Sequence, residues 1–213
     1  MKKYFLSLLG FFCVSHTIFA HPHSFVDMKN KVLITDDTLK GFAMSWMLDE
    51  ITSAELLYEI NHAEDKSDAI QKITDELSLS AVEAHYFSEF YNEKNEPIKF
   101  KAKPINPSVE IQKNRIIYHF ELTLAKPQPL KGHSFRLYTF EPSYYISMSY
   151  DNASDVTVTP QSICKVSMEE PQVNDSLRLY ASSLDQTETP DMPTTSSLSL
   201  GAMFSQKVNI VCQ

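Results

Sequence analysis

The chain has 213 residues, of which 43% are hydrophobic, with 11 prolines and only 4 glycines. This composition excludes collagen-like, low-complexity and wholly disordered chains, and the length suits one compact domain. Acidic side chains outnumber basic ones by 27 to 19 and the net charge is -8, which argues against nucleic acid as a partner.

The first twenty residues have the three parts of a secretory signal peptide. A basic start precedes an apolar run at residues 4–14 that is too short to span a bilayer, and the segment ends in the small residue Ala20. We therefore expect residues 1–20 to be removed and residues 21–213 to form a single periplasmic domain. No later stretch of sequence is long and apolar enough to be a transmembrane helix.

Cleavage would leave Cys164 and Cys212 as the cysteines of the exported chain, because Cys13 departs with the signal peptide. Disulfides persist outside the cytoplasm, so we expect these two residues to pair. Closing a loop of about 48 residues should stabilise the fold by roughly 3 to 4 kcal/mol on chain-entropy grounds. The alternative is a thiolate metal site, but the two cysteines lack the close spacing of a ligand pair.

Apolar periodicity predicts an opening hairpin at residues 25–34 and 39–47, joined by a polar turn. The period then becomes helical, and two helices are predicted at residues 49–60 and 67–79, with Thr52 beginning a capping-box motif in the first. Further strands are predicted at residues 86–92, 98–103, 108–112, 115–124, 134–139, 144–150, 156–159, 163–168 and 204–212, with a short helix at 176–183.

Strands stand on both sides of the helical pair without regular strand–helix alternation. This order predicts an α+β fold, in which a sandwich-like antiparallel sheet carries a helical pair inserted after the first hairpin. Residues near 184–200 are rich in serine, threonine and proline, and we expect a flexible loop there.

The most informative stretch is the one that cleavage would expose. His21 would offer an imidazole and a free α-amine, and His23 adds a second imidazole two residues on. In an extended chain Asp27 would face the same side, either as a ligand or as a residue that orients a histidine. Pro22 has no backbone N–H and so blocks the square-planar amino-terminal site that copper or nickel prefers.

What remains suits a divalent metal ion held by imidazoles, the amine and oxygen ligands. Zinc fits best, with copper or nickel as alternatives. The competing interpretation is that both histidines lie at a frayed, solvated terminus, and their spacing alone does not distinguish the two.

The other candidate ligands are acidic residues at a helix start and one loop histidine. Asp49 and Glu50 begin the first predicted helix, where they either ligate a metal or favour the positive end of the helix dipole. His62 lies beside acidic residues between the two helices and is a weaker candidate, because such loops are usually solvated turns. His119, within a predicted strand, is interpreted as a core or sheet-surface residue.

Sequence signals of catalysis are missing. The chain has no nucleophile elbow, no HExxH motif, no glycine-rich phosphate loop and no free cysteine after export. We therefore expect a binding protein and no enzyme. Two alternatives stay open: a copper centre with oxidative activity at the terminal histidine, and a structural or interaction domain that binds no metal.

Four stretches and the two later cysteines carry a resemblance to a known family. They are AHPHSFVD at 20–27, SWMLDE at 45–50, EPSYY at 141–145 and LGAMF at 200–204. In this order they resemble small periplasmic proteins of unknown function that occur beside nickel/cobalt-type permeases and are implicated in zinc uptake.

The resemblance implies a periplasmic accessory that binds zinc and delivers it to, or regulates, an inner-membrane permease of the nickel/cobalt type. It carries His21, His23 and Asp27 over as metal-site residues. Asp49 and Glu50 match the family as positions, with the choice between ligand and helix cap open.

Overall fold

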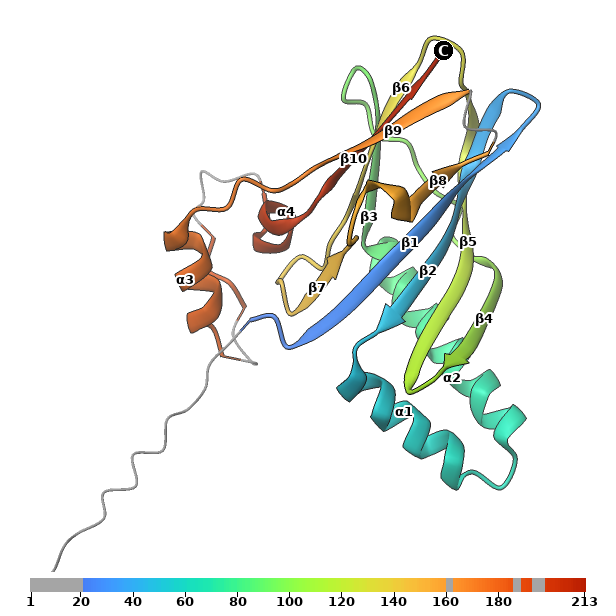
Figure 1. Cartoon of the computed structure of the whole chain (residues 1–213), viewed down its shortest axis with the longest axis vertical. Coiled ribbons are helices and arrows are strands. Elements are labelled where there is room, and N and C mark those ends of the chain that lie inside the picture. The colour runs from blue at the N-terminus through green and yellow to red at the C-terminus, as the bar shows by residue number, and fades with distance from the viewer. Residues whose placement is uncertain (1–20, 160–162, 186–188, 193–197) are drawn as a thin grey trace, which may run out of the picture.

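The computed structural model describes residues 21–159, 163–185, 189–192 and 198–213, and the predicted signal peptide lies outside them. Two β-sheets form the body of the described chain, with α1 at their lower end, α2 running behind the larger sheet, and α3 and α4 apart at one side (Figure 1). The predicted α+β, sandwich-like class is confirmed.

The larger sheet, sheet A, has the strand order β4-β5-β2-β1-β7, and β8 also pairs with β1. Its β1–β2 and β4–β5 hairpins are antiparallel as predicted, but β7 and β8 both run parallel to β1. Both strands come far later in the chain than β1, so no tight turn fixes their direction relative to it. The strands are β1 (Ser24–Thr35), β2 (Thr38–Leu48), β4 (Ile105–Gln112), β5 (Arg115–Pro129), β7 (Ile146–Ser149) and β8 (Val156–Val158).

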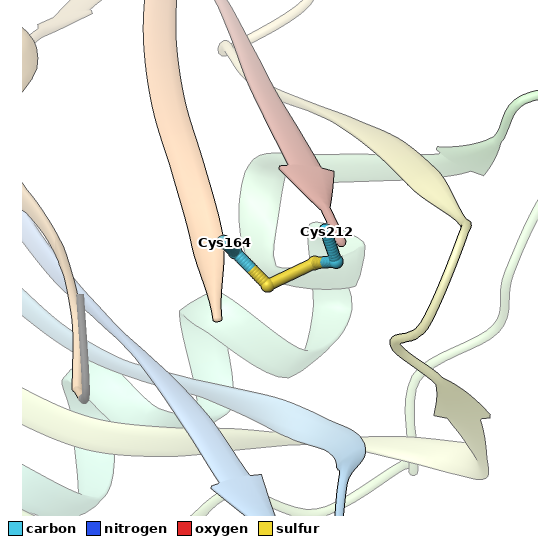
Figure 2. Close-up of a disulfide and its surroundings, with 2 residues drawn as sticks. All are labelled: Cys164 and Cys212. Atoms are coloured by element: carbon cyan, nitrogen blue, oxygen red, sulfur yellow. A yellow bond between two sulfur atoms is a disulfide. The ribbon is translucent and has the colours of Figure 1, made fainter. Parts of the chain in front are cut away.

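The smaller sheet, sheet B, is antiparallel throughout, with the order β3-β6-β10-β9. Cys164 opens β9 directly opposite Cys212 at the end of β10, and the predicted disulfide joins them with an S–S distance of 2.06 Å (Figure 2). The strands are β3 (Ser88–Asn92), β6 (Ser134–Thr139), β9 (Cys164–Glu169) and β10 (Lys207–Cys212).

The core lies between the two sheets and under α2. Along β1, Val26, Met28, Asn30 and Val32 are buried while the alternate side chains Asp27, Lys29 and Lys31 reach toward solvent, as the period of a half-buried strand requires. Sheet B covers part of this inner face and α2 covers the rest. The Tyr118 hydroxyl of β5 bonds Ser78 of α2 at 2.8 Å, which ties the helix to the sheet.

Helices α1, α2 and α3 follow the predicted positions with shifted ends, whereas α4 was not predicted. The helices are α1 (Glu50–His62), α2 (Lys66–Glu83), α3 (Asp175–Ser183) and α4 (Leu200–Phe204), with one-turn 3-10 helices η1 (His85–Phe87) and η2 (Ala153–Asp155). The predicted N-cap Thr52 is wrong: Asp49 caps α1 and accepts the N–H of Thr52 at 2.8 Å. A carboxylate three residues ahead satisfies that donor, so the helix starts earlier.

The predicted strand at residues 98–103 is also wrong. Its alternation of apolar residues and lysines has strand period, but the segment crosses from one sheet to the other. Ile98 N–H donates to the carbonyl of Phe90 in β3 at 2.7 Å, and Lys101 N–H donates to that of Thr123 in β5 at 2.8 Å. It therefore connects the sheets along one side and completes neither.

Three smaller points concern the chain after β2. Tyr86 lies in η1 rather than in β3, and β10 begins only at Lys207, because α4 precedes it. The predicted flexible loop near 184–200 falls partly outside the described residues, at 186–188 and 193–197. In the part of the chain that the structure describes, we find no helix with the length and apolarity needed to traverse a bilayer.

Candidate functional site

The first described residues are docked against distant parts of the chain. His21 is only 6% exposed, its backbone nitrogen donates to the carbonyl of Ala181 at 3.3 Å, and His23 N–H donates to the carbonyl of Tyr145 at 2.9 Å. In Figure 1 the chain start lies beside α3 and β7. The frayed terminus of the competing interpretation is therefore wrong. We name this region, comprising His21, His23, the turn at 141–145 and the end of α3, the histidine corner.

Two imidazoles meet in the histidine corner. The ring centroids of His21 and His23 lie 4.8 Å apart at an angle of 74°, and the ring of Tyr145 lies 5.1 Å from that of His23. Nδ1 of His21 is 3.3 Å from the carbonyl oxygen of Leu184. A carbonyl only accepts, so Nδ1 carries the hydrogen, and Nε2 of the neutral ring keeps the lone pair that a metal ion needs.

The turn at 141–145 is held by its own glutamate and by α4. The Glu141 carboxylate accepts the N–H groups of Ser143 at 2.9 Å and Tyr145 at 2.7 Å. Gly201 N–H of α4 donates to the carbonyl of Pro142 at 3.0 Å. A Cβ at Gly201 would lie 1.8 Å from the Glu141 carbonyl oxygen, so only glycine permits this approach.

The histidine corner rests on its own small apolar cluster. Ala181, Leu184 and Leu200 are buried there, separate from the main core, and the ring of Tyr144 stacks on Phe204 with centroids 4.0 Å apart. The corner is therefore packed by α3 and α4 rather than by the two sheets.

Asp27 does not join the histidines. Its carboxylate accepts a hydrogen bond from the Arg115 guanidinium at 2.9 Å on the solvent side of β1. The reason is that β1 begins at Ser24, so the strand alternation does not extend back to His21 and His23, which turn toward α3 and Tyr145.

The sequence left two roles open for Asp49, metal ligand or helix cap, and the structure shows it as the cap of α1. Its Oδ2 accepts from the Ser24 hydroxyl at 2.7 Å and from Phe25 N–H at 2.9 Å, in addition to the bond from Thr52. Burial acts most strongly on this group and would raise the pKa of Asp49, but the hydrogen bonds together lower it to about 2. The carboxylate thereby ties the start of α1 to the start of β1, and Glu50 next to it is exposed.

His62 belongs to a different region. Its Nδ1 donates to the carbonyl of Tyr58 at 2.8 Å and its ring lies on that of Tyr58, with centroids 3.9 Å apart. The nearby Asp65 caps α2 through the N–H groups of Ser67 and Asp68. Across the described ranges, no three histidine, cysteine or acidic side chains gather into a group that could hold a metal ion, so the predicted ligand set is brought together only as the pair His21 and His23.

Of the two placements expected for His119, core or sheet surface, the structure shows the sheet surface, within a chain of hydrogen bonds that the sequence did not reveal. Its Nδ1 lies 2.8 Å from the Ser45 hydroxyl and its Nε2 lies 3.1 Å from a Glu110 carboxylate oxygen. Serine hydrolases use the same order of groups, but in a water-shielded pocket with oxyanion donors. Here the three side chains lie on neighbouring strands of a solvated face, with Glu110 55% exposed, and we interpret them as cross-strand surface pairs.

The residues that complete the histidine corner were missed by local reasoning, because Tyr145, Ala181 and Leu184 contribute backbone carbonyls or a ring from far along the chain. One signal did indicate them. Three of the four stretches that carry the resemblance, at 20–27, 141–145 and 200–204, meet at this corner, and the fourth meets β1 through Asp49.

Comparisons with known proteins match nearly the whole chain. The family described as "Protein of unknown function (DUF1007)" matches residues 6–212. An uncharacterized protein of Haemophilus influenzae is 37% identical over 214 residues, which covers 100% of both chains. No solved structure matches the chain.

Proposed function

The chain belongs to the DUF1007 family, whose function is unknown, and we propose that it is a periplasmic accessory protein that binds a transition metal ion, above all zinc, and delivers it to an inner-membrane permease. The observation that supports this proposal is the meeting of His21 and His23, with ring centroids 4.8 Å apart, in a buried and hydrogen-bonded corner.

The histidine corner suits capture followed by release. Zinc in proteins takes four ligands, and this corner offers two imidazoles. Cleavage after Ala20 would turn the His21 nitrogen into an α-amine, a third nitrogen beside the carbonyl of Ala181. Coordination positions would remain open, so a partner with more ligands can take the ion over.

Position and compartment fit the same role. The carbonyls of Ala181 and Leu184 lie at the C-terminal end of α3, where the helix dipole favours positive charge such as a metal ion or a protonated amine. The disulfide between Cys164 and Cys212 is a bond typical of an oxidising compartment outside the inner membrane.

The test is a titration of the exported chain, residues 21–213, with zinc, copper and nickel, after mass spectrometry has verified its first residue. We expect one zinc ion per chain for the native sequence and loss of that binding in the double variant His21→Ala/His23→Ala. The matched control His62→Ala removes a histidine from the exposed end of α1 and should bind as the native chain does.

Metal-limited growth of cells that carry the double variant would then test delivery, since loss of the site should impair growth at low zinc. Equal zinc binding by the double variant, or no specific binding by the native chain, contradicts the proposal. Copper that changes oxidation state at these histidines would favour the oxidative alternative.

A further inference from the structure

A groove opens on the far side of α2 from α1, between the end of α2, η1, β3 and the crossing segment 97–102. Its volume is about 630 Å³, within the range of small-molecule sites. None of these elements contributes to the histidine corner, so the groove can be assessed independently of the proposed function.

Apolar side chains dominate the wall of the groove. Phe90 and Phe100 lie with ring centroids 6.1 Å apart, and Val82, Ile98 and Pro97 extend the same surface. The crossing segment is fixed to both sheets by the bonds of Ile98 and Lys101, so this wall is part of the rigid body of the protein.

The floor includes Tyr86, which sits in an unusual turn. His85, Tyr86 and Phe87 have φ values of +50°, +60° and +49°, a left-handed conformation that non-glycine residues rarely adopt. Backbone strain of this kind clusters at ligand sites. The hydroxyl of Tyr86 is buried and, among the described residues, has no hydrogen-bond partner.

The rim of the groove is basic although the chain is acidic. Lys99 and Lys101 line it, and the described part of the chain provides neither with an ion pair. Glu89 also lines the groove, and its carboxylate accepts a hydrogen bond from the Tyr91 hydroxyl at 2.8 Å, so the rim has two lysines against one glutamate. Two free ammonium groups beside an apolar wall complement a molecule with an apolar body and one anionic head.

We propose that this groove binds a single-chain amphipathic anion of the fatty-acid class, with its hydrocarbon chain against Phe90, Ile98 and Phe100 and its carboxylate between Lys99 and Lys101. Free monomeric acid is the ligand, since a groove bounded by β3, η1, the end of α2 and the crossing segment suits one hydrocarbon chain better than the flat surface of a bilayer.

The protein carries its own reporter for this test. Trp46 is the single tryptophan; its ring lies 4.7 Å from Phe120, which in turn stacks on Tyr86 at 5.9 Å. Titration of the metal-free exported chain with dodecanoate, below its micelle concentration, should change Trp46 fluorescence saturably, with calorimetry giving one site per chain. Dodecanol, which lacks the charge, should bind about tenfold more weakly.

The variant Lys99→Gln/Lys101→Gln should lose about tenfold in dodecanoate affinity and bind dodecanol unchanged. Its matched control, Lys113→Gln/Lys165→Gln, removes the same charge from exposed positions elsewhere and should bind dodecanoate as the native chain does. Circular dichroism of both variants establishes that they are folded.

Three results would overturn the proposal: absence of saturable dodecanoate binding, an equal loss in the control variant, or dodecanol binding as tight as dodecanoate. Co-sedimentation with phosphatidylglycerol vesicles in the absence of dodecanoate binding would also overturn it, in favour of a membrane contact. Since zinc is absent throughout, failure here leaves the metal proposal standing, and the reverse also holds.

Discussion

The end of α1 around His62 and the histidine corner both have histidine close in sequence to other possible metal ligands. They differ in whether the contacts of the histidine are made by neighbouring or by distant residues. At the end of α1, His62 bonds the carbonyl of Tyr58, four residues earlier, and the next aspartate caps the next helix. In the histidine corner, His21 bonds the carbonyl of Leu184, 163 positions away. Helix geometry alone explains the first region, whereas the second exists only because α3, α4 and the turn at 141–145 meet there.

The difference shows how a histidine becomes available for chemistry. Asp65, close to His62, already accepts a backbone N–H group at the start of α2. The His62 ring packs on that of Tyr58, and both residues are exposed to solvent. The ring of His21 is instead oriented by a distant carbonyl and faces a second imidazole. Long-range packing, rather than the density of ligand-type residues in the sequence, separates a candidate site from a polar loop.

Removing the disulfide should cause the largest loss of stability. The loop that it closes contains α3 and α4, which support the histidine corner, and contains nothing of the His62 region. We expect Cys164→Ser/Cys212→Ser to lower the free energy of unfolding by about 4 kcal/mol, as loop-closure entropy for a separation of 48 residues indicates. Urea denaturation of the native and variant chains measures it. A loss below about 1 kcal/mol would show that the loop is already constrained without the bond.

Gly201→Ala should separate the two regions most clearly. Its added methyl would meet the backbone of Glu141, so we expect a loss of about 2 to 4 kcal/mol in stability and weakened zinc binding, while the helices around His62 keep their far-ultraviolet dichroism. Gly132→Ala is the control: it has φ of +77° but open space, and should cost about 1 kcal/mol with zinc binding intact. Equal effects of the two substitutions would contradict the packing argument.

Two helix caps can be compared, one that also bonds β1 and one that bonds only its own helix. Their removal tests whether the additional bonds to β1 increase the contribution of the cap to stability. Asp65→Ala removes only the cap of α2 and should cost about 1 kcal/mol, whereas Asp49→Ala also removes the bonds to Ser24 and Phe25 and should cost about 2 kcal/mol. Thermal or urea unfolding of both variants gives the comparison, and equal losses would show that the link to β1 adds nothing.

Asp49 should also make the stability of the fold depend on pH. The pKa of Asp49 is about 2 in the folded chain against an ordinary value of 3.8, so its ionised form stabilises the fold. That contribution, about 1 to 2 kcal/mol, is complete above about pH 4 and is lost as the pH falls through 2. Unfolding free energies measured from pH 6 to 2 should fall more for the native chain than for Asp49→Ala, and parallel curves would contradict this.

The smallest effect is expected at His62. Its ring is exposed and its one side-chain hydrogen bond is local, so His62→Ala should change stability by less than about 0.5 kcal/mol and leave zinc binding unchanged. Calorimetric titration beside denaturation checks both. A loss of zinc affinity here would place a ligand in the loop and reverse the comparison from which these predictions start.

Local sequence pattern was enough for much of the fold. The hairpin from β1 to β2, the helical pair, the β4–β5 hairpin and the disulfide followed from periodicity, turn residues and cysteine count. Strand direction was predictable only where a tight turn imposes it, which is why the parallel pairing of β1 with β7 was missed. Residues 98–103 have strand period but divide their hydrogen bonds between two sheets, and no local pattern expresses that.

The candidate site was predictable in part for the same reason. His21 and His23 stood out as ligand types at an expected new terminus, and they do lie together. Asp27 was placed with them by extending strand alternation to residues that are not in a strand, and its partner Arg115 lies 88 positions away. The choice between cap and ligand for Asp49 required the distances to Ser24 and Phe25.

The parallel alignment of β1 with β7 and β8 also sets the order of events during folding. β1 is the first strand made, yet Ser24 waits for Ile146, Asn30 waits for Val156, and His21 waits for Ala181. Closing such long loops is slow, so we expect these contacts to form late, after the local hairpin of β1 with β2. The two imidazoles are therefore brought together only in a chain that has been synthesised nearly to its end and has folded, and a truncated or misfolded copy cannot present them as a pair.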